Sequence, residues 1–190
     1  MKKLSLLFVV LALGGTPACK KDSGAKAPAP KPGDTATGDT KAAPAAKPLE
    51  LTEKVDIGAA VLKADPDDSG WNGITIAAPK GAVIDTAGGS PSLVIDDHMS
   101  VGLGGEKDLA EKRQQAQDDQ LQKFARFVVD EPDAILWEGK STIDGSSNFL
   151  LVVNVKLGDK TKSCTTDGYG SYTQANAEAV LKACRGMARN

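Results

Sequence analysis

The chain has 190 residues, a net charge of −2 and 41% hydrophobic but only 4% aromatic residues. Residues 49–190 carry a net charge of −7, because the 48 residues before them hold eight lysines and three aspartates. Such an acidic segment argues against nucleic-acid binding, which needs clustered Lys and Arg to neutralise phosphates. Its length suits one domain.

Residues 1–18 have the three parts of an export signal. Two lysines follow Met1, the run LSLLFVVLAL is uncharged and apolar, and small residues lead to Ala18. The apolar run is shorter than a transmembrane helix, which needs about 20 residues. The pattern therefore predicts a signal peptide over residues 1–18 and an exported protein.

The residues Thr16-Pro17-Ala18-Cys19 resemble the lipobox of bacterial lipoproteins, in which the cysteine becomes the first mature residue and carries lipid. Ala18 fits the lipobox, whereas Thr16 and Pro17 are not its usual residues. The resemblance implies acylation of Cys19, with palmitate among the chains, and attachment to a membrane of the cell envelope. Lys20 stands where some bacteria place an inner-membrane retention Asp, which favours the outer membrane. The alternative is ordinary cleavage after Ala18, which releases a soluble protein.

The stretch after the cysteine has the composition of a flexible linker. Residues 20–48 hold five prolines and eight alanines but no aromatic residue, Leu, Ile or Val. Such a stretch buries too little apolar surface to offset the entropy of ordering. We therefore predict that 19–48 is the lipidated cysteine with a disordered tether, which reaches roughly 30 to 90 Å. A single globular domain is predicted over 49–190.

The first half of this domain predicts strands and one long helix. Residues 74–78 are expected to form a strand that ends at Pro79, and 92–96 with 99–103 a hairpin. Residues 107–129 contain no Gly or Pro and have apolar side chains at positions 121, 124, 125 and 128. That spacing predicts a helix with one buried face, which Glu131-Pro132 ends.

The second half predicts an antiparallel meander followed by a helix over 174–188. Its three strands are predicted over 134–143, 148–157 and 160–166. A turn at 144–147 joins the first two, and Gly158-Asp159, with glycine first, favours a type II′ turn between the last two. The middle strand is apolar on both faces, which predicts helices on each side of the sheet. The predicted fold class is therefore α+β, with a mainly antiparallel sheet and helices on both faces, an α/β/α sandwich.

The two remaining cysteines are expected to meet. If Gly158-Asp159 forms the turn, paired residue numbers sum to 317, so Cys164 lies opposite Val153. Cys184 lies on the apolar stripe of the last helix, which must pack on a sheet face. In the oxidising compartment that export implies, we predict a disulfide between Cys164 and Cys184. The alternative is a pair of buried free thiols.

The element order suggests a second family resemblance. A strand ending in Pro-Lys-Gly, a long helix, a three-strand meander and the terminal pattern KSCTTDGYGSYTQANAEAVLKACRGM resemble the PsbP-like α/β/α sandwich over about residues 70–188. That family occurs among small exported bacterial lipoproteins. The resemblance implies a binding or assembly module, and it carries over no functional residue.

The stretch Asp65-Pro66-Asp67-Asp68-Ser69-Gly70 opens like a calcium loop. The EF-hand needs a bidentate Glu at its twelfth position, and that position is Ile76 here. No metal site is therefore predicted outright, and the nearest candidate ligands are Asp65, Asp67 and Ser69. The alternative is an acidic exposed loop before Trp71.

Few other residues suggest chemistry. His98 is the only histidine and lies in a predicted turn between acidic residues, with no nucleophile placed beside it. No phosphate-binding or dinucleotide glycine motif is present. The tyrosine-bearing loop 168–172 is a candidate partner contact, with local packing against the last helix as the alternative.

These observations predict a non-enzymatic exported lipoprotein, a membrane-tethered binding or assembly module of the bacterial cell envelope. Its partners are then the membrane, through the lipid on Cys19, and an envelope protein. No catalytic residue and no cofactor are predicted. The alternative is a periplasmic domain that binds a small ligand or a metal through the acidic loop 65–70.

Overall fold

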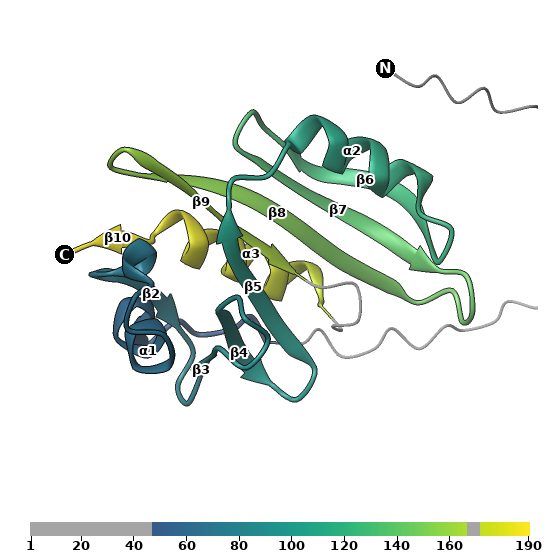
Figure 1. Ribbon diagram of the computed structural model, residues 1–190. Helices are drawn as coiled ribbons and strands as arrows, with labels where there is room; N and C mark the ends of the chain where they lie inside the picture. The colour runs from purple at the N-terminus through teal and green to yellow at the C-terminus, as the bar shows by residue number, and fades with distance from the viewer. Residues whose placement is uncertain (1–46, 167–171) are drawn as a thin grey trace, which may run out of the picture. The chain divides into compact units, whose positions relative to one another are not determined.

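The computed structural model describes residues 47–166 and 172–190, all within one compact unit, Ala42–Asn190 (Figure 1). The predicted signal peptide, Cys19 and nearly all of the predicted tether lie outside the described residues. No helix among the described residues is long and apolar enough to cross a membrane.

The fold is α+β, as predicted, and its main sheet has seven strands that are all antiparallel. Their order is β3-β4-β5-β9-β8-β7-β6. The bounds are Val83–Asp85 for β3, Ser92–Asp96 for β4, Met99–Gly105 for β5, Gln122–Asp130 for β6, Ala134–Ser141 for β7, Ser147–Leu157 for β8 and Lys160–Thr166 for β9.

A smaller sheet and three α-helices complete the described part of the chain. The small sheet has the order β1-β2-β10, with β1 at Glu53–Asp56, β2 at Ile74–Ala78 and β10 at Ala188–Arg189. The helices are α1 at Ile57–Ala64, α2 at Leu109–Asp118 and α3 at Gln174–Arg185, and a short 3-10 helix, η1, spans Ser69–Trp71.

The meander has the predicted register. Leu157 pairs with Lys160 across Gly158-Asp159, so the turn has two residues, and Cys164 lies opposite Val153. Gly158 has a φ of 71°, which a glycine adopts without steric cost at the first position of a type II′ turn. The turn therefore fixes which β9 side chains face the core.

The predicted helix over 107–129 is wrong in its second half. The helix ends at Asp118, and Gln122–Asp130 forms the edge strand β6. The side chain of Asp119 accepts hydrogen bonds from the backbone N–H groups of Leu121 and Gln122, at 2.8 and 3.1 Å, which closes a turn between the two elements. Two irregularities in the β6–β7 pairing give β6 the uneven apolar spacing that resembles a helical stripe.

Other boundaries also differ from the predictions. The last helix ends at Arg185 and not at residue 188, because Gly186 caps it and Ala188 enters β10. Elements β1, α1 and β3 were not predicted from the sequence, since each is too short to show a clear period. Helix α1 begins where the side chain of Asp56 accepts a hydrogen bond from the Ala59 N–H, at 2.9 Å.

The side chains of β7 and β8 pack against different helices on their two faces. Leu136, Leu151 and Val153 belong to the large core that includes the buried face of α3. Ile135 and Val152, which alternate with them, pack with Leu109 of α2. Helices α2 and α3 therefore lie on opposite faces of these strands, and Figure 1 shows α2 across the β6–β7 side of the sheet.

Candidate functional site

The predicted disulfide is present. Cys164 on β9 is bonded to Cys184 on α3, their Cα atoms are 6.2 Å apart, and both residues are fully buried. The bond joins the sheet to the helix that covers its main core. Because both sulfurs are bonded and shielded, their role in this fold is structural and they supply no thiol for chemistry.

The acidic loop 65–70 lies between α1 and η1, and its carboxylates stabilise turns. Asp65 accepts a hydrogen bond from the Asp67 N–H at 3.1 Å, and Asp68 accepts one from the Gly70 N–H at 2.9 Å as the N-cap of η1. Among residues 47–166 and 172–190, no three or more His, Cys, Asp or Glu side chains are grouped to hold a metal ion. Metal binding by Asp65, Asp67 and Ser69 stays a prediction.

The predicted turn histidine and tyrosine loop have no common site among the described residues. His98 is exposed in the β4–β5 turn, and its backbone N–H donates to Asp96 at 2.8 Å. Residues 168–171 lie outside the described residues. Tyr172 is buried, and its hydroxyl donates to the carbonyl oxygen of Ser100. This contact agrees with the packing alternative for Tyr172.

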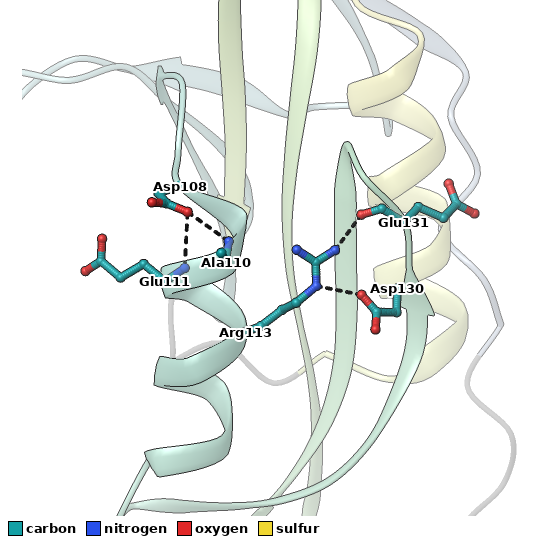
Figure 2. Close-up of polar contacts among 6 residues, drawn as sticks. All are labelled: Asp108, Ala110, Glu111, Arg113, Asp130 and Glu131. Atoms are coloured by element: carbon teal, nitrogen blue, oxygen red, sulfur yellow. Dashed lines mark hydrogen bonds and ion pairs between the residues drawn. The ribbon is translucent and has the colours of Figure 1, made fainter.

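A candidate binding site lies beside α2, a helix of mostly polar residues. Only Leu109 and Ala116 of α2 are buried. The side chain of Asp108 caps its first turn by accepting from the N–H groups of Ala110 and Glu111, at 2.9 and 3.2 Å (Figure 2). Such a helix has little apolar area to hold it on the sheet, so polar contacts contribute much of its attachment.

Arg113 makes two of these polar contacts. Its Nε lies 2.6 Å from Asp130, and a second guanidinium nitrogen donates to the carbonyl oxygen of Glu131 at 2.7 Å (Figure 2). Asp130 is the last residue of β6, and Glu131 is the first residue of the turn between β6 and β7. From α3, Arg185 forms an ion pair with the Glu131 carboxylate and a second one, at 3.2 Å, with Asp133. The turn is therefore bound by one arginine from each helix.

The charges around this turn favour the protonated form of Arg185. Burial alone lowers the pKa of Arg185, but the hydrogen bonds and negative charges of Glu131 and Asp133 outweigh it and raise the pKa above its ordinary value. Both acids are half exposed, so solvent screens these ion pairs and each one stabilises only modestly.

A polar network lies near the middle of the paired strands β6 and β7. The carboxylate of Glu138 accepts hydrogen bonds from the Ser147 hydroxyl at 2.7 Å and from Arg126 at 2.9 Å. These two hydrogen bonds, the serine first, lower the pKa of Glu138 below its ordinary value although partial burial opposes them. Arg126 also donates to Gln174 at the start of α3, at 3.2 Å. The network connects strands β6, β7 and β8 with the start of α3.

Between α2 and the sheet lies a groove of about 210 Å³, hereafter the α2 groove. Trp137, Leu150 and Val152 form its apolar part. Lys112 and Gln115 of α2 and the C-cap residue Asp119 form its polar border, Ala116 of α2 also lines it, and Thr165 and Thr166 of β9 lie on its other side. The hydroxyl oxygen of Thr165 is buried without a hydrogen-bond partner.

This arrangement suits binding more than chemistry. The groove has an apolar floor and a charged border with one base and one acid. Such combinations accept an apolar side chain or small apolar group and orient it by a few polar contacts. None of its lining residues is a histidine or a cysteine.

Comparison with known proteins found no match: no family model, no curated protein and no solved structure is significantly similar to this chain.

The sequence analysis missed the α2 groove. Residues 119–129 were predicted to belong to the helix, so neither strand β6 nor a short polar helix over β7 was expected. The available signal was the composition LAEKRQQAQD, because a helix with so few apolar residues leaves part of an apolar sheet face uncovered. Trp137 and Leu150 were recognised only as strand residues.

Proposed function

We propose that the chain is an exported lipoprotein, anchored to the envelope through Cys19, whose domain is a non-enzymatic binding or assembly module. The support for the anchor is the sequence alone, namely the signal-like residues 1–18 and the lipobox-like stretch that ends at Cys19. The composition of 20–48 supports a tether, because a lipid-held domain needs a spacer to reach a partner. Lys20, which stands where some bacteria place an inner-membrane retention Asp, supports the outer membrane over the inner.

The observation that carries the binding proposal is the α2 groove. A half-buried tryptophan beside two buried apolar side chains, with a polar border, is the kind of surface at which a partner's side chain contributes most binding energy. We propose that an envelope protein inserts an apolar side chain between α2 and β8. The acidic net charge of 49–190 supports a protein partner over a nucleic acid.

The finer fold assignment belongs to the same proposal. Helices on opposite faces of β7 and β8 agree with an α/β/α sandwich, and the element order agrees with the PsbP-like resemblance in part. The resemblance loses one of its elements, because the long helix is a short helix and an edge strand. It stays a prediction, as does its implication of an assembly role.

Photo-crosslinking in intact cells tests the partner. A photoreactive amino acid replaces Gln115, which borders the α2 groove, or Lys63, which is exposed on α1, as the matched control. We expect a discrete crosslinked protein from position 115 only. Equal products from both positions, or none from position 115, contradict the groove as the binding surface.

The anchor is tested separately. The variant Cys19→Ser is expected to lose detergent partitioning while it keeps the same folded domain. If the variant still partitions into detergent, the lipid anchor is refuted, whatever the crosslinking shows.

A further inference from the structure

A second pocket, lined by different residues from the α2 groove, contains two basic side chains. It is lined by three chain segments that meet at one end of the domain and has a volume of about 350 Å³. The lining residues are Ser69, Asn72, Gly73, Lys160, Arg189 and Asn190. Ser69 belongs to the acidic loop 65–70, one of the candidate metal sites, so this loop borders a pocket that carries basic side chains.

The two cations of the pocket have no acidic partner of their own. Among the described residues, no ion pair within 4.0 Å joins Lys160 or Arg189 to a carboxylate. Lys162, two residues along β9, lies with its Nζ 4.0 Å from the ring centroid of Trp71. Burial, followed by repulsion from Lys160 and Arg189, lowers the pKa of Lys162, whereas the charge of Asp68 opposes this. The three positive charges therefore act on one another.

Neutral donors stand beside these cations. The Ser69 hydroxyl and the Asn72 amide line the pocket, and both residues are exposed. A fourth cation, Lys54, donates to the side-chain oxygen of Asn190 at 3.3 Å. Four cations therefore lie at this end of the domain, and the charge of Asp68 acts on one of them, Lys162.

The pocket is built by backbone pairing. The Asn190 N–H donates to the Gly73 carbonyl at 2.8 Å, next to the pairing of β10 with β2. Gly73 has a φ of 70°, and a Cβ there would lie 3.2 Å from the Asn190 backbone oxygen. The hydrogen bond holds the last strand close to the loop, and the lack of a Cβ at Gly73 allows this close approach. The pocket is therefore already formed and needs no large rearrangement to receive a ligand.

We propose that this pocket binds a phosphate group, with Lys160 and Arg189 as the charge partners and Ser69 and Asn72 as neutral donors. Arg pairs with phosphate oxygens through two parallel N–H groups, and Lys adds a point charge. Two sources share this chemistry, a free phosphate and a phospholipid headgroup. The site is independent of the α2 groove, so either proposal can fail alone.

The test uses the full chain with Cys19→Ser, so that no acyl chain contributes. Inorganic phosphate is titrated at constant ionic strength while the backbone amide of Gly73 and the indole N–H of Trp71 are followed by NMR. We expect saturable shifts at both. Lys160→Gln and Arg189→Gln are each expected to weaken binding about tenfold, because each removes a charge-assisted hydrogen bond.

Lys156→Gln is the matched control. Lys156 is exposed on β8 of the same hairpin, and strand alternation places it on the other face from Lys160. It is expected to leave phosphate binding unchanged. An equal loss in Lys156→Gln, or no saturable binding, overturns the pocket as a site.

Vesicles distinguish the two sources. Binding to phosphatidylglycerol vesicles but not to phosphatidylcholine vesicles, lost in Arg189→Gln and displaced by phosphate, assigns the pocket to a headgroup. Phosphate binding without vesicle binding assigns it to a free phosphate. Vesicle binding that ignores both phosphate and Arg189→Gln overturns the proposal.

Discussion

The disulfide between Cys164 and Cys184 is expected to contribute about 3 kcal/mol to the free energy of unfolding. The bond closes a loop with a sequence separation of 20 residues. In the chain-entropy model a loop of this length costs the unfolded chain about 3 kcal/mol of conformational freedom. Since the folded chain already holds the two residues together, most of this difference appears as stability.

Two perturbations separate the cross-link from the packing of its sulfurs. Reduction of the parent protein removes the bond but keeps both buried sulfur atoms. The double variant Cys164→Ala with Cys184→Ala also removes the sulfurs, which costs roughly 1 kcal/mol for each. The double variant is therefore expected to be less stable than the reduced parent, by roughly 2 kcal/mol.

Urea unfolding followed by far-UV circular dichroism measures both effects. With a slope of about 1–3 kcal/mol per molar urea, a loss of 3 kcal/mol lowers the midpoint by about 1–3 M. Cys19→Ser is the control, because Cys19 takes no part in the bond. If reduction changes the free energy of unfolding by less than about 0.5 kcal/mol, the loop-closure reasoning is refuted.

Three other predictions rest on single side chains. Gly58→Ala is expected to destabilise the domain by about 2 kcal/mol or more in thermal unfolding, because the new Cβ would lie 2.5 Å from the backbone oxygen of Trp71. This clash outweighs the gain in helix propensity of about 1 kcal/mol, so a stabilised variant contradicts the prediction. Asp144 is expected to titrate at about 2 in a carbon-detected NMR titration, because serine hydroxyls, that of Ser141 first, hold its pKa there, and Ser141→Ala is expected to raise the pKa; an unchanged value rules this cause out. The pKa of Glu138 is lower in the folded chain than its ordinary 4.5, so the stabilisation from its charged form is present above that pH and is lost as the pH falls through the folded pKa. The variant Glu138→Gln is therefore expected to show a shallower fall of the free energy of unfolding in acid. An equally steep fall in the variant is evidence against this reasoning.

Sequence reasoning succeeded where one local signal determined the geometry. Gly158-Asp159 predicts the β8–β9 register, and that register places Cys164 on the core face. The apolar run of β8 also predicted a strand that is buried on both faces. Successive side chains of a strand point to opposite faces, so an unbroken apolar run places apolar side chains on each face.

Sequence reasoning failed where two periods fitted the same residues. The run from Leu121 to Val128 satisfies a helical stripe, but in the structure Leu121 is 71% exposed and the β6–β7 pairing has two irregularities. The pocket around Lys160 and Arg189 was invisible for another reason. Its residues come from three segments, two of which are brought together by the β2–β10 pairing, and no spacing in the chain encodes their meeting.

The position of α2 depends on a series of contacts that begins at the disulfide. Cys184 fixes α3 to β9, and the next residue, Arg185, binds the turn between β6 and β7. The same turn accepts Arg113 from α2, with Glu131 contacted by both arginines. The α2 helix is thus held near its middle by one partly exposed ion pair and one hydrogen bond to the backbone, whereas α3 is held by a covalent bond and a broad apolar face.

This difference predicts that α2 opens before α3. Local opening is easiest where few apolar contacts are lost, and α2 buries two side chains against six residues buried in α3. In hydrogen exchange, the amide protons of α2 are expected to exchange at least about tenfold faster than those of α3, and Arg113→Gln is expected to widen the gap without changing α3. Equal protection of the two helices contradicts this reasoning, because it means that α2 opens only when the whole domain unfolds. The α2 groove would then have a fixed width, and its partner would have to fit the groove as it stands.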